Sequence, residues 1–476
     1  MFDVAVIGAG VVGGMIAREL SRHDLKICIL EAEGDVALGA TRANSAIVHA
    51  GFDAKEGSLK AKLNVLGSYM MEGVCSELGV KYKKNGSLVV GFNEEDERTL
   101  GELLERGKKN GVRGLSILKR DEILAIEPNI GTEVTVALRA ESGAIVCPYE
   151  LCLAAVGNAM DNGVELRLNF RVAKIEKSDG YYTLSSADDS VRARWVINCA
   201  GVYSDEVASL AGKSDFTVRP RRGEYILLDK ECGGLVGHTV FRCPSKMGKG
   251  VLVTPTVDGN LLIGPTADDI DDKRDVATTV RGMDEVKRKA SLQVAGINFG
   301  KTITTFAGLR AVGSTGDFII NESDRFINVA AIESPGLSAS PAIAMYVLDL
   351  MLAAGELLLP REDFIHCRRP AHYFRELSED EKNEIIKKDP SYAHVICRCE
   401  TVTEGEIREA IRTNPRPSDV DGVKRRTRAS MGRCQGGFCL PYIVELLADE
   451  LGIPYDEVTK LGGDSKINIG KTKEDV

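Results

Sequence analysis

The chain has 476 residues, a length that predicts about three domains, and its 43% hydrophobic and 28% charged residues exclude wholesale disorder. Sixty-one basic and 70 acidic residues give a net charge of −9, which argues against a general nucleic-acid-binding protein. The 49 glycines, roughly a tenth of the chain against an average of about 7%, favour an α/β fold with many tight turns near a cofactor.

The N-terminal residues carry no targeting pattern, because Met1 is followed directly by the apolar run Val4–Ile7 without a basic segment. The longest apolar stretch, Ala342–Pro360, contains Asp349 and Glu356, so we expect a buried or amphipathic helix there and no membrane span. The sequence therefore predicts a cytoplasmic protein. Peripheral association with a membrane is compatible with this prediction.

The first 31 residues have the pattern of a β-α-β unit. We expect a strand over Asp3–Gly8, a helix over Val11–Arg22 and a second strand over Leu25–Glu31. Between the first strand and the helix, the chain has the glycine pattern Gly8-x-Gly10-x-x-Gly13.

Each of these glycines has a separate physical role in a dinucleotide site. Gly8 permits the tight turn, Gly10 lets a pyrophosphate approach the backbone, and Gly13 allows the helix to pack closely on the strand. The pyrophosphate would bind at the helix N-terminus. Glu31 ends the second strand, eighteen residues after Gly13, where a carboxylate can bind a ribose hydroxyl.

The nucleotide-binding domain is expected to be discontinuous, with parts at residues 1–80, 146–213 and 311–366. A strand beginning at Trp195 ends at Ala200-Gly201, and a later strand over Phe326–Ala331 leads to a helix expected from Pro341. This arrangement is typical of FAD enzymes. We expect the backbone amides of Gly336, Leu337 and Ser338 to face the flavin, and Val172, in a strand after Asn169, to contact the adenine.

Residues 81–145 and 214–310 alternate apolar and polar side chains, as in Gly223–Leu228 and Gly250–Pro255. They predict an antiparallel sheet, forming a substrate or cap domain over the flavin. Residues 367–391 are charged and bounded by prolines, which is typical of a linker. Residues 392–476 predict a small helical module with a capping box at Thr403–Glu406 and a helix over Leu440–Leu451.

The twelve cysteines fall into two groups. Eight are scattered among apolar neighbours and are expected to be small buried side chains. The other four form two pairs, Cys397-x-Cys399 and Cys434-x4-Cys439, thirty-four residues apart, a pattern that in a cytosolic chain indicates a metal centre.

Four thiolates can bind either a structural zinc ion or a [2Fe–2S] cluster. The one-residue gap between Cys397 and Cys399 is unusual for zinc, so we favour the cluster. The basic run Lys424–Arg428 either offsets the negative charge of that cluster or is a solvated helix end.

Several segments resemble the FAD-dependent glycerol-3-phosphate oxidase/dehydrogenase family, which has the D-amino-acid-oxidase-like fold and is related to L-2-hydroxyglutarate dehydrogenases. They occur in the family's order over residues 1–365: Thr41-Arg-Ala-Asn44-Ser45-Ala-Ile-Val-His49-Ala-Gly51, Arg221–Tyr225, Gly248–Pro255, Asn260–Thr266, Phe306–Arg310 and Ser334–Ser338. The resemblance implies an α/β fold with a Rossmann-like FAD-binding domain and an antiparallel-sheet cap.

The last eighty or so residues resemble the bacterioferritin-associated-ferredoxin-like [2Fe–2S] module. It is fused to the catalytic subunit of anaerobic glycerol-3-phosphate dehydrogenases and is missing from the simple oxidases of the family. Residues Arg426–Cys439 carry this resemblance, although four residues separate the second cysteine pair here and two separate it in the free-standing ferredoxin.

The resemblance also implies roles for individual residues. His49 would take the hydroxyl proton of the substrate, a task that suits an imidazole with an ordinary pKa near 6.5. Lys249 and Arg310 would bind the substrate anion, whether phosphate or carboxylate. Residues at the boundary between FAD and substrate would be Thr41, Arg42, Asn44, Ser45 and Ser334, with Gly201 also near the cofactor.

The sequence therefore predicts an FAD-dependent dehydrogenase of sn-glycerol 3-phosphate, which passes electrons through the cluster to a second flavoprotein subunit or a quinone. An L-2-hydroxyglutarate dehydrogenase on the same fold is the nearest alternative. A non-catalytic subunit that relays electrons between flavin and cluster is an alternative of another class, and an amine oxidoreductase is a third.

Overall fold

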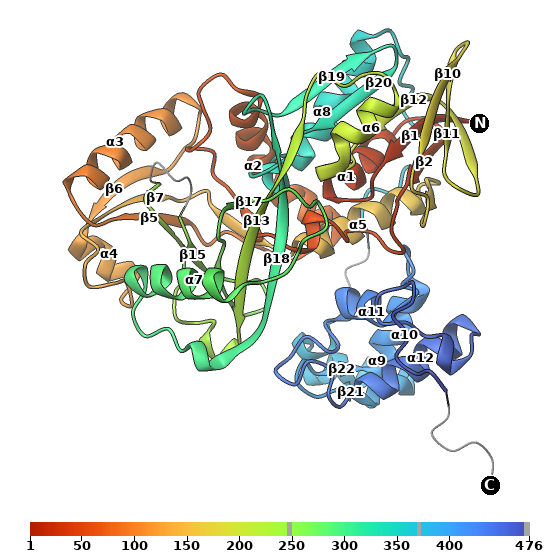
Figure 1. Ribbon diagram of the computed structural model, residues 1–476. Helices are drawn as coiled ribbons and strands as arrows, with labels where there is room; N and C mark the ends of the chain where they lie inside the picture. Colours follow the sequence, from red (N-terminus) through yellow and green to blue (C-terminus); the bar gives the residue numbers. More distant parts are fainter. Residues whose placement is uncertain (245–249, 369–372, 471–476) are drawn as a thin grey trace.

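The computed structural model describes residues 1–244, 250–368 and 373–470, so Lys249 lies outside the described residues. Two lobes are joined through the long strands β13 (Val218–Leu228) and β18 (Thr302–Gly313), and the C-terminal module lies beside helix α5 (Pro148–Asp161) (Figure 1).

The first lobe is built on an eight-stranded sheet whose central strands are parallel. Its parallel part has the order β9-β2-β1-β12-β20, and β10, β11 and β19 join it by antiparallel pairing. The strands are β1 (Phe2–Ile7), β2 (Ile27–Leu30), β9 (Glu165–Arg167), β10 (Lys174–Ser178), β11 (Tyr181–Ser185), β12 (Ser190–Asn198), β19 (Ile319–Ser323) and β20 (Phe326–Ala330). The apolar runs of β1, β2 and β20 reflect burial on both faces of the sheet, as in other parallel sheets covered by helices.

Helices α1 (Val11–Leu20), α2 (Leu59–Leu78), α5 and α8 (Gly336–Ala353) pack together in the core of this lobe, and α6 (Ser204–Leu210) packs near β12 and β20. By length and composition α8 could cross a membrane, but 61% of it is buried here. It begins at Gly336 rather than at the expected Pro341. Pro341 cannot donate to the carbonyl of Leu337, and the Ser340 hydroxyl donates to it instead, at 2.9 Å.

The cap lobe is a nine-stranded sheet with the order β17-β13-β16-β15-β14-β5-β7-β6, and β18 pairs with β13. Its pairing is antiparallel as predicted, except that β14 and β5 are parallel. The further strands are β5 (Ser87–Gly91), β6 (Leu115–Lys119), β7 (Val136–Ala140), β14 (Thr239–Arg242), β15 (Leu252–Pro255), β16 (Leu261–Gly264) and β17 (Asp268–Asp269). Helices α3 (Glu94–Lys109), α4 (Arg120–Ile126) and α7 (Val280–Gln293) belong to this lobe, and β3 (Ile47–Val48), β8 (Ala144–Val146) and β4 (Tyr82–Lys83) form a small separate sheet.

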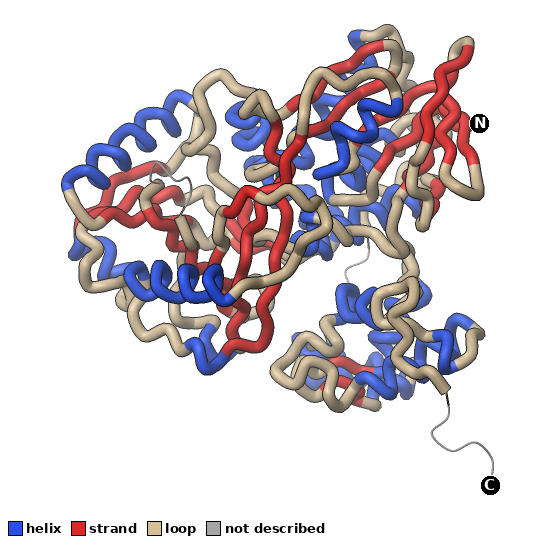
Figure 2. The backbone as a smooth tube through the Cα atoms, in the orientation of Figure 1, coloured by secondary structure: helices blue, strands red, loops and turns tan. Residues whose placement is uncertain are grey.

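The C-terminal module consists mainly of helices and loops (Figure 2). It contains β21 (Val395–Cys397), β22 (Val402–Thr403), α10 (Glu404–Arg412), α11 (Val420–Thr427) and α12 (Leu440–Leu451). The capping box of Thr403 and Glu406 is present, and α12 has the predicted bounds. Part of the expected linker is also ordered here, since α9 (Glu379–Lys388) lies within it and the Phe374 amide donates to Glu406 at 2.9 Å.

The basic run Lys424–Arg428 fastens this module to the rest of the protein, which corrects the expectation of a solvated helix end. Arg425 and Arg426 donate to the carboxylate of Asp35 in the first lobe, at 2.6 and 2.8 Å, and the side chains of all three are buried. Burial opposes ionisation of Asp35, but the two guanidiniums outweigh it and hold its pKa below the usual range.

Arg428 makes a second attachment, to the cap lobe. It donates to Asp258 at 2.8 Å and to Asn260 at 3.1 Å, both in the loop between β15 and β16, and to Glu400 of its own module at 2.9 Å. Because breaking a buried ion pair leaves a charge without a partner, these contacts fix the module against both lobes.

A glycine on β18 allows the cap lobe to approach the segment that follows the nucleotide fold. A Cβ at Gly308 would lie 1.8 Å from the carbonyl oxygen of Ala43, so Gly308→Ala should lower stability by about 1–3 kcal/mol through overpacking. Gly101 is the control, because it lies in α3 with nothing within 4 Å of its Cβ position, and Gly101→Ala should not destabilise. Thermal unfolding at one scan rate would measure both, and equal midpoints would contradict this close approach.

Candidate functional site

The glycine pattern after β1 forms the expected turn into α1. Gly8 has φ +103°, and a Cβ there would lie 2.5 Å from the carbonyl oxygen of Cys199. A Cβ at Gly13 would lie 2.1 Å from the carbonyl oxygen of Gly8, which explains the need for a small residue where helix and strand meet. Gly10 is the N-cap of α1 and offers no side chain to cap it, so this helix N-terminus suits an anion such as a pyrophosphate.

The segment after β2 supports this turn with two side chains. Glu31 accepts hydrogen bonds from the amides of Ala9, at 2.7 Å, and Glu33, at 3.0 Å. Thr41 Oγ1 accepts from the amide of Val11 at 3.0 Å. Burial raises the pKa of Glu31, although these amides oppose the shift. The residues present therefore fit a dinucleotide, with Glu31 at the end of β2 as predicted.

The other residues expected near the cofactor differ in their surroundings. Asn44 closes its own loop, since its amide donates to Thr41 O at 2.9 Å and its oxygen accepts from the Ala46 amide at 2.8 Å. Gly201 has φ +58°, in the turn after β12. Val172 is not in a strand, because β10 begins only at Lys174. Burial and the nearby Arg425 lower the pKa of Arg42.

His49 follows β3 and is held by the start of α8. Its amide donates to Ser338 Oγ at 2.7 Å, and that hydroxyl donates to Ile47 O at 3.3 Å. The Ser338 side chain is fully buried, so it fixes the backbone of the His49 segment. Ser334 Oγ lies 3.4 Å from His49 Nε2. The structure thus brings His49 together with Ser334 and Ser338, which lie 285 and 289 positions further along the chain and were assigned to the same site from the sequence.

Tyr225 completes the wall of this site, although the sequence analysis gave it no role. Its hydroxyl lies 3.2 Å from Ser45 Oγ, and its ring stacks on Phe306 with centroids 4.9 Å apart. Phe241 was also missed, and its ring centroid lies 5.7 Å from that of His49. Tyr225 is the last residue of the family-like segment Arg221–Tyr225, so that segment could have pointed to it. Nothing in the local sequence marks Phe241.

Arg310 lies on the same face of β18 as Phe306 and Gly308, because alternate residues of a strand share a face. Ala43 covers Gly308 on that face, so Arg310 borders the loop that leads to His49. Its guanidinium donates to Thr266 O at 3.1 Å, and it forms no ion pair with any carboxylate in the described residues. Its neighbours Arg221 and Arg222 both form ion pairs, with Asp269 and Asp275, whereas the guanidinium of Arg310 is available to an anionic ligand.

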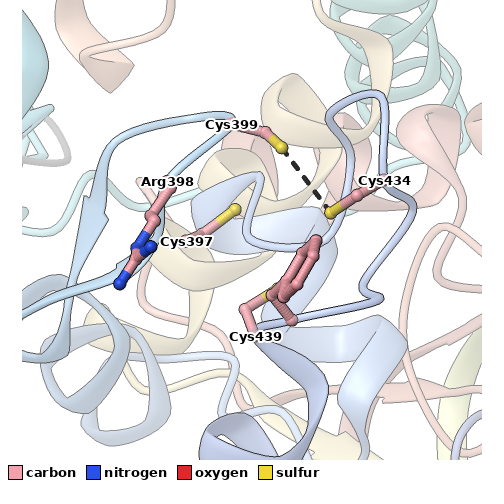
Figure 3. Close-up of a pocket in the computed structure, with 6 residues that line it drawn as sticks. Cys397, Arg398, Cys399, Cys434 and Cys439 are labelled. Carbon is pink, nitrogen blue, oxygen red and sulfur yellow. Dashed lines mark hydrogen bonds between the residues drawn. The ribbon is translucent and has the colours of Figure 1, made fainter.

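The four C-terminal cysteines line one cavity of about 180 Å³, together with Arg398 and Phe438. Figure 3 shows Cys397, the last residue of β21, and Cys399 just after it facing Cys434 and Cys439 from the segment before α12. Cys399 and Cys434 have their sulfurs 3.5 Å apart. Hydrogen bonds from the Cys439 thiol and from the backbone of Ser430 and Glu400 lower the pKa of Cys397 to about 6, which favours the thiolate needed for metal binding.

The arrangement of these sulfurs separates the two metal alternatives. One tetrahedral zinc ion, at about 2.3 Å from each sulfur, would draw all four sulfurs to within roughly 4 Å of one another. No three of these four described sulfurs lie within 4.8 Å of one another. Two pairs of thiols suit a cluster with two irons, each bound by one pair.

The eight scattered cysteines follow the prediction in most cases. Six are buried, whereas Cys232 is half-buried and Cys367 is exposed. None of the chain's twelve cysteines, all of which the structure describes, forms a disulfide.

Comparison with known proteins identifies both parts of this chain. The FAD dependent oxidoreductase (DAO) family model matches residues 3–350, and the BFD-like [2Fe-2S] binding domain model matches residues 395–449. A glycerol 3-phosphate dehydrogenase of Caloramator mitchellensis is 48% identical over the full length of both chains. A glycerol 3-phosphate oxidase of Mycoplasma pneumoniae is 33% identical over 73% of this chain and 94% of its own.

Similarity to solved structures agrees with these matches. The FAD-bound L-alpha-glycerophosphate oxidase of Mycoplasma pneumoniae superimposes with a TM-score of 0.74 and 30% identity, over 77% of this chain and 98% of its own. The human L-2-hydroxyglutarate dehydrogenase is 34% identical, but over only 56% of this chain and 61% of its own. The glycine turn and the paired cysteines fit FAD and a [2Fe–2S] cluster, and the chain belongs to the FAD dependent oxidoreductase family, with a C-terminal BFD-like [2Fe–2S] domain.

Proposed function

We propose that this protein oxidises sn-glycerol 3-phosphate to dihydroxyacetone phosphate. The observation that carries the proposal is the contact of Ser334 with His49, together with Arg310 on β18, which has no carboxylate partner among the described residues. The relative that matches this chain over its full length, C-terminal domain included, is named for the same activity.

His49 would remove the proton from the substrate's C2 hydroxyl. Its imidazole is positioned through its backbone by Ser338 and lies beside the Ser334 hydroxyl, which can orient either the ring or the substrate. FAD, when bound, supplies the acceptor for the hydride that leaves C2 as the carbonyl forms. The imidazole acts as a base only in its neutral form.

Arg310 would bind the phosphate of the substrate. A guanidinium without a carboxylate partner binds a phosphate without first breaking an ion pair, and its planar fork can donate two hydrogen bonds. Lys249, which lies outside the described residues, is proposed as the second cation for the same anion.

The C-terminal cluster would carry electrons away from the flavin one at a time. An enzyme that reduced O₂ directly would have no evident need for it, so we infer a dehydrogenase rather than an oxidase. A second flavoprotein subunit or a quinone is proposed as the acceptor. A cytoplasmic location agrees with twelve unpaired thiols.

The oxidation of L-2-hydroxyglutarate remains the competing reaction, because Arg310 would bind a carboxylate as well as a phosphate. The shorter match to the human enzyme of that name makes it the second candidate. Turnover of the two substrates by the same preparation separates them.

Replacing the proposed base tests the chemical step. His49→Ala should slow flavin reduction by glycerol 3-phosphate by about 10²–10⁴-fold with FAD still bound, as expected for loss of a general base. Anaerobic stopped-flow absorbance measures this rate. His394→Ala, which alters an exposed histidine of the C-terminal module, is the control and should reduce normally. A His49→Ala rate close to that of the parent would remove His49 from the mechanism.

Removing the anion-binding cation tests the choice of substrate. Arg310→Met should lower kcat/KM for glycerol 3-phosphate roughly 10- to 100-fold, the effect expected when a hydrogen bond to a charged group is lost. The slow turnover of glycerol, which has no phosphate, should change little. Arg221→Met, which breaks a surface ion pair on the neighbouring strand, should change neither. Equal kcat/KM for glycerol and glycerol 3-phosphate would contradict phosphate recognition, and a preference for L-2-hydroxyglutarate would establish the competing reaction.

Removing two ligands tests electron exit. Cys434→Ser combined with Cys439→Ser should eliminate iron and acid-labile sulfide from anaerobically purified protein. With FAD at saturating concentration, substrate should still reduce the flavin, whereas electron transfer to the acceptor should fail. Cys232→Ser combined with Cys367→Ser is the matched control and should retain the cluster. Zinc without sulfide in the parent protein would show that the module is structural.

A further inference from the structure

The segment from Glu31 to Arg42 supports the glycine turn that binds FAD. Glu31 accepts from the Ala9 amide, Thr41 accepts from the Val11 amide, and the Ala37 amide donates to Ala9 O at 3.0 Å. Three backbone groups of this turn, two amides and one carbonyl, are therefore hydrogen-bonded to one segment. Any displacement of that segment would move the groups that face the nucleotide.

The cluster-binding module contacts the centre of the same segment, Glu31 to Arg42. Asp35 lies between Glu31 and Thr41, its side chain is 1% exposed, and three guanidinium nitrogens of Arg425 and Arg426 bind it at 2.6–2.8 Å. Helix α11, which carries both arginines, also packs against α5 (Figure 1). In turn, the Cys152 thiol of α5 contacts Ala9 O at 3.3 Å.

Asp35 is poorly suited to this position without its partners. A buried carboxylate is strongly destabilised unless it is paired, and within the described residues the other hydrogen bond of Asp35 comes from the amide of its neighbour Val36, at 2.8 Å. If α11 withdrew, Asp35 would lose both guanidiniums, and the segment from Glu31 to Arg42 would lose its attachment to the module.

We propose that the iron–sulfur module locks FAD into the first lobe through Asp35, so that seating of the module and binding of FAD stabilise each other. The second attachment of the module, from Arg428 to Asp258, contacts the cap loop and not the FAD-binding segment. By linkage, a change in the module that weakens FAD must be matched by an equal effect of FAD on the seating of the module. The inference concerns FAD binding and is independent of which alcohol the enzyme oxidises.

The test changes only the module and measures FAD. Arg425→Met removes a guanidinium whose hydrogen bond in the described structure goes to Asp35. We expect the dissociation constant of FAD, followed by the fluorescence of released flavin, to rise at least tenfold. Arg425→Lys keeps a cation opposite Asp35 and should restore most of the affinity. Arg412→Met breaks an ion pair with Glu450 inside the module and should leave FAD affinity unchanged.

Iron and sulfide content, measured on each variant, shows whether the module is folded. If Arg425→Met binds FAD more weakly and Arg425→Lys recovers the affinity, the lock is supported, whether or not the cluster is retained. If Arg425→Met binds FAD as tightly as the parent protein, the lock is overturned, again whether or not the cluster is retained. The lock is also overturned if Arg412→Met weakens FAD binding as much as Arg425→Met does. A protein that fails to turn over glycerol 3-phosphate but shows these affinities would contradict the proposed function and leave the lock standing.

Discussion

The segment between Glu31 and Gly51 is the constraint on which the rest of the structure depends, because nearly every functional group is positioned by it or against it. Its early part holds the glycine turn, its middle part lies against Gly308 of the cap strand, and its last part carries His49. Side chains of this segment contact three separate parts of the chain, since Glu31 binds the glycine turn, Ser45 meets Tyr225 of β13, and Asp35 binds α11. This explains why the nucleotide fold, the cap and the C-terminal module cannot be treated as independent units.

Sequence patterns were informative where a local rule determines the conformation. The glycines at 8, 10 and 13 predicted a turn whose close contacts the structure confirms, and Thr403 with Glu406 predicted a helix start that is present. Such rules fail when another side chain supplies the hydrogen bond that the rule counts as lost. Pro341 indicated a helix start, but the Ser340 hydroxyl satisfies the carbonyl that the proline leaves free, so the helix begins five residues earlier.

Contacts between lobes could not be predicted from the sequence, because they join residues that lie far apart in the chain. Nothing next to Lys424–Arg428 shows that buried carboxylates at Asp35 and Asp258 lie opposite, so the run resembled a solvated or cluster-neutralising charge. The same holds for Tyr225, whose hydroxyl meets Ser45 only because β13 is folded against the loop before β3. Where the sequence did assign residues to a site, as for His49 and Ser334, the assignment came from the family resemblance, and the fold supplied their proximity.

The ion pairs that hold the module also constrain how electrons can leave the flavin. A module attached by buried charges to both the first lobe and the cap has little freedom to swing, since detaching it would expose Asp35 and Asp258 together with three arginines. On the proposed function, the cluster would then receive electrons across a fixed separation. Delivery to the proposed partner would occur at the outer side of the module, where Cys399 and Phe438 are exposed at the cavity that the four cysteines line. A rigid relay of this kind favours a partner that docks on the cluster over one that competes with the substrate for access to the flavin.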